Sequence, residues 1–192
     1  MQTLLPALTA LAAVALLAGG CSGEGEPGAT PSPPPPSASE HAGADEPSLR
    51  AGLVRLWVGD DATAEDTETG ECFADALIEA STPQQLAGAG ILDGSHTVVA
   101  ELPVLDRAGA ELWVDAQLAC TDLVAESTRA QVAATKGKVD RTAYEACLRD
   151  ALTEQQLREA AEEAVMGNLA GDAVSAFSAA QLTCVQQALP PD

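Results

Sequence analysis

Hydrophobic residues recur along the C-terminal half of the chain with the spacing of an amphipathic helix. Over residues 144–152 the apolar positions fall at i, i+3, i+4, i+7 and i+8, which is one face of a helix. Residues 157–165 repeat this spacing, and charged residues occupy the opposite face. The same periodicity runs through most of the chain after residue 47, and it predicts an all-α fold.

Further helices are predicted on either side of these two. A helix over 48–58 begins at Ser48, and residues 127–136 are its expected counterpart. The segment 91–106 contains Pro103 and lacks a partner strand, so we expect an ordered loop over the core, with Asp106 capping the next helix. Two apolar stripes mark two more helices, one with Leu112, Trp113, Ala116, Ala119, Cys120, Leu123 and Val124, the other with Phe177, Ala180, Cys184 and Ala188.

Three short patterns occur twice, in the same order. They are C-x-x-D-A-L at 72–77 and 147–152, T-x-Q-Q-L at 82–86 and 153–157, and A-Q-L-x-C at 116–120 and 180–184. The repetition predicts two tandem helical pseudo-repeats, residues 48–126 and 127–192, each of about three to four helices. The alternative is a coincidence in an alanine-rich chain.

Thr82 and Thr153 are predicted to open two of the helices. Each stands three residues before a glutamine, which is the spacing of a capping box. In that motif the hydroxyl accepts a hydrogen bond from a free backbone amide, and the glutamine reaches back to the capping residue. Pro83 fits the first helical position as well. We therefore interpret the repeated Q-Q-L as a helix start and not as a functional motif.

Residues 1–20 carry no charge, and their apolar run from Leu4 to Ala18 has the length of a secretory signal. The run ends in "LLAGGC", with small residues directly before Cys21. This stretch resembles a bacterial lipobox, in which the cysteine is acylated and the preceding peptide is cleaved. The resemblance implies a signal peptide over 1–20, a lipid on Cys21 and a place on the outer face of the cell membrane. An ordinary secretory signal and an uncleaved anchor are the alternatives.

The segment from Cys21 to residue 47 is predicted to be a disordered tether. Residues 22–47 contain seven prolines among glycines, serines and acids, but no leucine, valine, isoleucine or aromatic residue. Such a segment buries too little apolar surface to offset the entropy of ordering. Fully extended, it would reach roughly 80 Å at about 3.1 Å per residue, so it acts as a spacer between a membrane and the folded part.

Composition narrows the class of partner. The chain has 29 acidic and 9 basic residues and a formal charge of −20, which excludes nucleic acid as an expected partner. The remaining expectations are an unknown protein or a cationic ligand, together with the membrane through Cys21. Aromatic residues make up only 3% of the chain. Because alanine buries little area, the core is expected to be thin and to need covalent support.

The four cysteines beyond Cys21 provide that support, since an even number in an exported protein favours disulfides. If the repeats are real, each closes its own bridge, which gives the preferred pairs Cys72–Cys120 and Cys147–Cys184. The main rival joins Cys72 to Cys147 and Cys120 to Cys184. A zinc site is a poorer alternative, because the folded part contains no C-x-x-C and only one histidine.

No catalytic constellation is evident. His96 has Asp93 and Ser95 beside it in sequence, but neighbours in a turn rarely form a relay, and no G-x-S-x-G occurs. Asp75 and Asp150 occupy matching repeat positions and are interpreted as surface residues. We therefore expect a protein that is not an enzyme and that uses no cofactor.

The stretch 60–71 holds six carboxylates and is interpreted as a solvated acidic loop. It lacks the pattern of a calcium-binding EF-hand. Asp60, Asp61, Glu65 and Asp66 are weak candidates for Ca²⁺, so an exported calcium- or metal-binding protein is one alternative function.

The folded part, with C-x-x-D-A-L, T-x-Q-Q-L and the later A-x-x-x-C helix, resembles small helical cysteine-containing domains of exported proteins from high-GC Gram-positive bacteria. That group brings no activity to carry over. The function expected is a lipid-anchored, non-catalytic, cell-surface binding module. An extracytoplasmic enzyme of unknown type is the second alternative.

Overall fold

The structure is a computed structural model that describes residues 45–60 and 62–190. This part of the chain is all-helical, as predicted, and its only β-type pairing is an isolated bridge between Leu92 and Val98. The predicted signal peptide, Cys21 and the tether up to residue 44 lie outside the described residues. The described residues form eight helices: α1 (Glu46–Val58), α2 (Ala64–Ala80), α3 (Pro83–Gly88), α4 (Arg107–Cys120), α5 (Leu123–Ala134), α6 (Arg141–Ala151), α7 (Glu154–Val165) and α8 (Asp172–Ala188).

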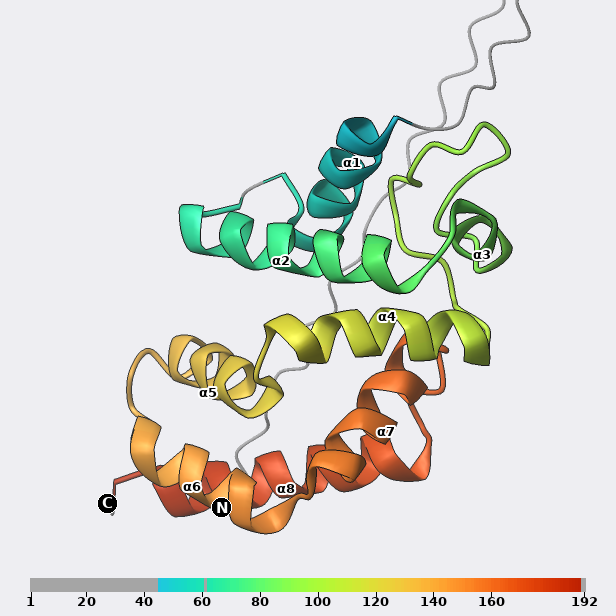
Figure 1. Cartoon of the computed structure of the whole chain (residues 1–192). Helices are drawn as coiled ribbons and strands as arrows, with labels where there is room; N and C mark the ends of the chain where they lie inside the picture. The colour runs from blue at the N-terminus through green and yellow to red at the C-terminus, as the bar shows by residue number, and fades with distance from the viewer. Residues whose placement is uncertain (1–44, 61, 191–192) are drawn as a thin grey trace, which may run out of the picture. The chain divides into compact units, whose positions relative to one another are not determined.

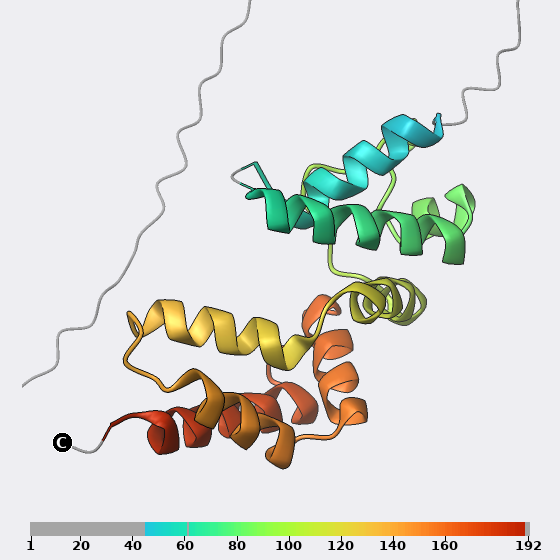
Figure 2. The same cartoon turned by 60° about the vertical axis from the view of Figure 1, so that its left-hand side comes forward.

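We call α1 to α4 the first half of the folded part and α5 to α8 the second half. The helices pack mainly on neighbours from their own half. Helix α1 packs on α2, which packs on α4, while α5 and α8 both pack on α6 (Figure 1). The halves meet through α4 and α7, and α7 also packs on α8. In both views α4 lies between α2 and α7 (Figure 2). Helix α7 therefore belongs to the second half by sequence but supports the first.

The first half has its own hydrophobic core around three aromatic rings. Trp57 of α1 stacks on Phe73 of α2 with ring centroids 4.2 Å apart. Trp113 of α4 meets the edge of Phe73 at 4.6 Å. Large rings bury more area than any other side chains, which matters in a chain so rich in alanine. The partly buried Ala161, Val165 and Met166 of the α7 region pack against this core and close it.

The second half forms a separate and smaller core. Fully buried Tyr144 and Leu148 of α6 lie at its centre, with Val124 of α5 and Cys184 of α8. The hydroxyl groups of Tyr144 and Ser127 are 3.3 Å apart, within hydrogen-bond distance. Each half thus has its own core, although the α7 region of the second half packs against the first.

Both predicted capping boxes are present. Thr82 accepts from the amide of Gln85, and Thr153 from that of Gln156; each glutamine side chain accepts in return from the threonine amide. The predicted cap of α4 is also confirmed, because Asp106 Oδ1 accepts from the amide of Gly109 at 2.8 Å. These residues satisfy amides that the first turn leaves without an intrahelical partner.

The structure corrects two predicted helix boundaries. Helix α1 begins at Glu46, with Asp45 as its N-terminal cap; Ser48 lies inside the helix and donates to Asp45. The apolar stripe from Leu112 to Val124 is not one helix, because the chain turns after Cys120 and Asp122 caps α5. The expected junction at 126/127 therefore falls inside α5, which starts at Leu123 and not at residue 127.

The helices that carry the repeated patterns follow one another in the same order in both halves. Helices α2, α3 and α4 carry the first copies, and α6, α7 and α8 carry the second. The paired copies differ in length: α2 has 17 residues against 11 in α6, and α3 has 6 against 12 in α7.

Candidate functional site

A groove runs along α1 and is bounded on its far side by residues 95–100. It encloses about 900 Å³. Gly52 marks the point where α1 touches this segment, because a Cβ there would lie 2.8 Å from Val98 Cγ2. Asp45 and Asp60 line the groove at positions flanking the two ends of α1. A helix of 13 residues is about 20 Å long, so the groove is elongated.

The wall opposite α1 is a turn organised by Asp93. Its Oδ1 accepts hydrogen bonds from the amides of Ser95 and Thr97, at 2.8 and 2.9 Å. The Asp93 amide in turn donates to the carbonyl of Thr97. Within this turn His96 adopts a φ of +60°, a left-handed conformation uncommon for residues other than glycine. The predicted ordered loop over 91–106 is therefore present, and it holds the only histidine of the described part beside α1.

His96 lies in the groove together with the hydroxyl groups of Ser48 and Ser95. Ser48 Oγ donates to Asp45 Oδ2 at 2.9 Å. Within residues 45–60 and 62–190, the imidazole of His96 has no hydrogen bond to a serine or to a carboxylate. An activated nucleophile requires a base within hydrogen-bond reach and a group that orients the base. The groove as built provides a mixed polar and apolar lining suited to binding.

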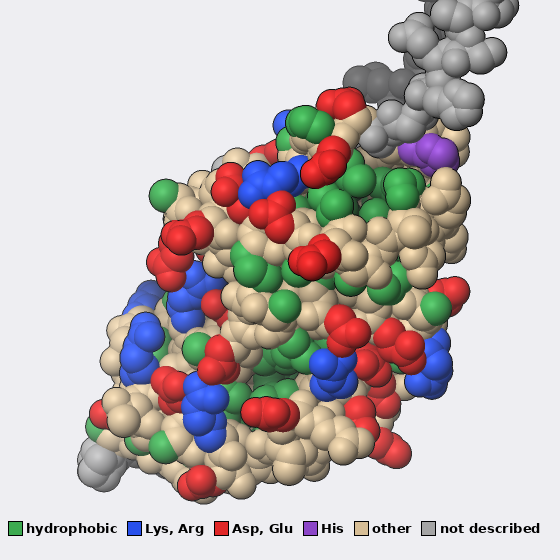
Figure 3. Space-filling model, viewed as in Figure 1, with side chains coloured by type: hydrophobic (Ala, Val, Ile, Leu, Met, Phe, Trp, Pro, Cys, Tyr) green, Lys and Arg blue, Asp and Glu red, His purple; other side chains and the backbone are tan. Residues whose placement is uncertain are grey.

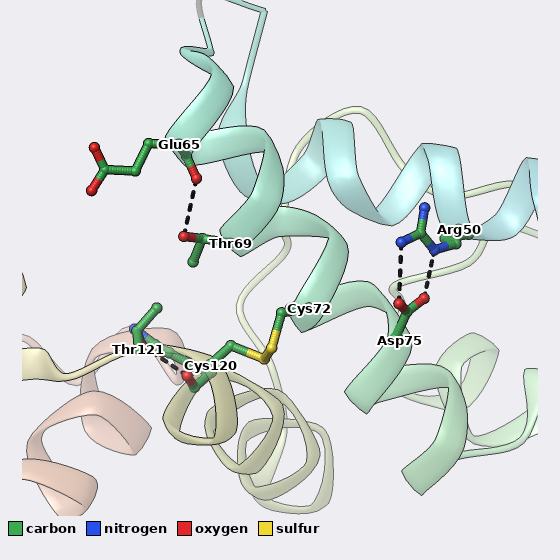
Figure 4. The surroundings of a disulfide bond; sticks show 8 residues. Arg50, Glu65, Thr69, Cys72, Asp75, Cys120 and Thr121 are labelled. Carbon is green, nitrogen blue, oxygen red and sulfur yellow. Dashed lines mark hydrogen bonds and ion pairs between the residues drawn. A yellow bond between two sulfur atoms is a disulfide. The ribbon is translucent and has the colours of Figure 1, made fainter.

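Arg50 projects from another part of α1 onto α2. Its Nε and Nη2 donate to the two carboxylate oxygens of Asp75, at 2.5 and 3.1 Å (Figure 4), and Glu71 lies 3.4 Å from Nη2. The hydrogen bonds from Arg50 hold the pKa of Asp75 below its ordinary value. Asp75 is thus an exposed ion-pair partner; Asp150, at the matching repeat position, has no such pair among the described residues.

The acidic stretch 60–71 is not a loop, because α2 begins at Ala64. Thr63 and Asp66 form a third capping box, which the sequence analysis missed. Hydrogen bonds from Thr63, and then the charge of Arg129, lower the pKa of Asp66. Asp66 is therefore occupied as a cap, and it also lies 3.5 Å from Arg129 of α5.

The calcium candidates do not converge in the part of the chain that can be described. Asp61 lies outside it. Among the described residues no group of three or more histidine, cysteine, aspartate or glutamate side chains is placed to hold a metal ion.

Two disulfides are present, Cys72–Cys120 and Cys147–Cys184, with Cα–Cα distances of 5.8 and 5.5 Å. Each bridge lies within one half, which is the pairing that the repeat favoured; the rival pairing and a zinc site are not formed by these four residues. The first bridge joins α2 to the last residue of α4, and the second joins α6 to α8.

A second cavity, of about 590 Å³, lies where α4 passes into α5 and α6 into α7. Leu118, Leu123 and Leu157 line it, and Arg149 and Arg158 lie among its lining residues. Arg149 Nη2 lies 2.6 Å from Asp122, whose pKa is lowered mainly by this hydrogen bond. The sequence analysis did not anticipate this cavity, because it depends on contacts between segments far apart in the chain.

Acidic side chains are spread over the visible face, with fewer basic side chains beside them (Figure 3). Within residues 45–60 and 62–190, no helix combines the length and the apolar character that crossing a membrane requires. Comparison with models of protein families, with curated proteins and with solved structures gives no match.

Proposed function

We propose that the protein is a lipid-anchored, non-catalytic binding module on the outer face of the cell membrane. The observation that carries the proposal is the groove along α1, which is the larger of the two cavities described above. Among the described residues that line it, no hydroxyl group is hydrogen-bonded to the imidazole of His96. A concave surface lined by apolar and polar groups is the usual form of a binding site.

The two disulfides support the exported location in this proposal. Disulfides persist mainly in oxidising compartments outside the cytosol, and both halves of the folded part contain one. The lipobox-like stretch before Cys21 supplies the anchor in the proposal. The proline-rich residues 22–47 supply a spacer that carries the groove away from the membrane surface.

The partner is a protein or a cationic ligand. The net charge of −20 raises the local concentration of cations and steers a basic partner toward the molecule. Asp45 and Asp60 place carboxylates along the groove, and Arg55 is the only lysine or arginine among the described residues that line it. We infer that the apolar wall around Val98 contributes contact area and that the carboxylates select for positive charge.

The two halves are proposed to derive from one duplicated helical unit. The shared order of the patterned helices and the two matching bridges support the duplication. Under this proposal the groove is specific to the first half, because the segment 91–106 between α3 and α4 has no long counterpart: α7 and α8 are separated by only a short turn.

Photo-crosslinking in living cells tests the proposed function. A photoreactive amino acid is placed at Ala51 or Ser95, which are exposed residues of the groove, or at Ala133, an exposed residue of α5. We expect both groove positions to form the same crosslinked product and the α5 position to form none. Equal labelling from all three positions would show that the groove is not the binding surface.

An enzyme is the competing function, since His96 lies in the groove with Ser48 and Ser95. The two functions predict different effects of the substitution His96→Ala. For a binding module, partner crosslinking persists in the variant, because the imidazole supplies only part of the lining. Turnover of a ligand by the unaltered protein that His96→Ala abolishes would instead establish catalysis.

A further inference from the structure

The two disulfides differ in their access to solvent. Cys72 is exposed and Cys120 is half-buried. In the second bridge Cys184 is fully buried in the second core and Cys147 is half-buried against it. Exchange begins when a thiolate reaches a disulfide sulfur, so access is one of the factors that set its rate. The first bridge is therefore open to attack at Cys72, and the second is shielded.

Carboxylate side chains lie beside Cys72, the exposed end of the first bridge. Glu68 and Asp75 lie four residues before and three residues after Cys72, so they share its face of α2. Arg50 binds Asp75, which leaves Glu68 as the neighbouring carboxylate without an ion pair among the described residues. Glu65, one turn nearer the N-terminus of α2 (Figure 4), is a further carboxylate on this helix, and its charge interacts with that of Arg129 of α5. A cationic thiol is attracted to this face, and an anionic one is repelled.

The position of the bridge gives its reduction a local consequence. Cys120 is the last residue of α4, and the chain turns immediately afterwards at Thr121 and Asp122. These two residues also line the second cavity. The bridge therefore ties the α4–α5 turn to α2. When it opens, we expect α2 and the turn to lose this covalent tie, while the edge contact between Phe73 and Trp113 still joins α2 to α4.

We propose that Cys72–Cys120 is a site of thiol–disulfide exchange for an exported dithiol protein with a basic surface, while Cys147–Cys184 is a permanent structural bridge. A thiolate of the partner attacks Cys72 Sγ, the Cys72–Cys120 bond breaks, and Cys120 leaves as a thiolate that takes up a proton. The partner's second thiol then attacks its own sulfur in the mixed disulfide and releases Cys72 as a thiol. The partner is oxidised to a disulfide and the bridge is reduced by two electrons.

Partial reduction of the purified full-length chain tests the selectivity. The probe is dithiothreitol, followed by alkylation of free thiols and mass-spectrometric mapping of the labelled cysteines. We expect label on Cys72 and Cys120 to appear about tenfold faster than label on Cys147 and Cys184. Equal rates, or earlier labelling of the second pair, would overturn the proposal.

The charge of the partner is tested with three small thiols compared at equal thiolate concentration. We expect cysteamine, which is cationic, to open the first bridge faster than 2-mercaptoethanol, and the anionic mercaptoethanesulfonate to be slowest. The differences should shrink at high salt, where the Debye length is only about 3 Å at 1 M. Glu68→Gln should reduce the differences among the rates at which the three thiols open the first bridge. Glu159→Gln, on α7, should leave these differences unchanged. The same order for all three thiols at the second bridge, or no spread at the first, would refute a basic partner.

Discussion

Cys72 and Cys120 lie 48 residues apart in sequence, yet their Cα atoms are 5.8 Å apart and their sulfur atoms are bonded. Cys147 and Cys184 repeat this relationship at a separation of 37 residues. Each bridge closes one helical half around its own core. Covalent closure suits a chain in which alanine, which buries little area, replaces much of the usual aromatic content.

Removal of either bridge is expected to destabilise the protein to a similar extent. The loops closed by the two bridges are of comparable size, so the chain-entropy contribution is about 4 kcal/mol for each. The variants are the double substitutions Cys72→Ser with Cys120→Ser, and Cys147→Ser with Cys184→Ser. Urea unfolding followed by circular dichroism measures the loss; an unchanged midpoint for either variant would contradict it.

The halves also offer separate spectroscopic probes. Both tryptophans, Trp57 and Trp113, belong to the first core, and the single tyrosine, Tyr144, lies at the centre of the second. We expect loss of the first bridge to shift the tryptophan unfolding transition more than the tyrosine transition, and loss of the second bridge to do the reverse. Identical shifts at both probes would show that the two cores unfold as one.

Asp75 is expected to make stability depend on pH in the acidic range. Its pKa is lowered in the folded state by hydrogen bonds from Arg50. The contribution of the Asp75–Arg50 pair to the free energy of unfolding is therefore complete above the ordinary aspartate pKa of 3.8. It is lost as the pH falls through the lower pKa that Asp75 has in the folded state.

Asp75→Asn removes this contribution, so the variant should be less stable than the parent at neutral pH and converge with it in strong acid. The side chain is exposed, and we expect the difference to be small. Asp150→Asn is the matched control, because Asp150 occupies the corresponding repeat position without an ion pair in the described structure. Thermal unfolding between pH 2 and pH 7, values chosen to bracket the carboxylate range, checks the pattern; a stability difference that persists at the acid end would count against it.

Glu163 is expected to stabilise α8 from outside the helix. Gly171 precedes α8 and has no side chain to cap it; instead Glu163 Oε2 accepts from the amides of Ala173 and Val174, each at 3.0 Å. A Cβ on Gly171 would collide with this carboxylate, so glycine makes room for the cap. Glu163→Ala should lower the free energy of unfolding by about 1 kcal/mol, as the loss of a capping side chain does.

Glu159→Ala on the same helix is the control for this substitution, since Glu159 is exposed and, within the described residues, its side chain accepts a hydrogen bond only from Gln155. Denaturant unfolding of both variants is the measurement. Equal costs for the two would show that Glu163 does not act as a cap.

The groove is expected to depend on the absence of a side chain at residue 52. Gly52→Ala places a Cβ against Val98 and should push the segment 95–100 away from α1. Gly94→Ala is the control, because a Cβ there meets nothing within 4 Å. We expect Gly52→Ala, but not Gly94→Ala, to reduce crosslinking from Ser95. If both variants crosslink as the parent does, the groove geometry is not needed for binding.

Local patterns predicted much of this fold. The spacing of apolar residues predicted an all-helical chain, and a threonine three residues before a glutamine predicted the starts of α3 and α7. Both signals are local, since they rest on residues within one or two turns. The repeated cysteine patterns extended the prediction to long-range pairing, because a repeat relates positions that are far apart.

Most of the features that the sequence analysis missed depend on contacts between residues far apart in the chain. The apolar stripe continues through residues 120–124, so nothing in the periodicity reveals that α4 ends at Cys120 and that Asp122 caps the start of α5. The capping box of α2 is an exception, because Thr63 and Asp66 are only three residues apart; the sequence analysis treated Asp66 as one carboxylate among six in the stretch 60–71. The groove and the cap by Glu163 depend on contacts across the fold, which no local pattern encodes.

The intact mass of the mature protein, purified from the membranes of its own host, tests the account most directly. We predict a chain that starts at Cys21, carries the added mass of its acyl groups and contains two disulfides. A protein that retains residues 1–20, lacks acyl groups or has all five thiols reduced would contradict the proposal of an anchored, exported module.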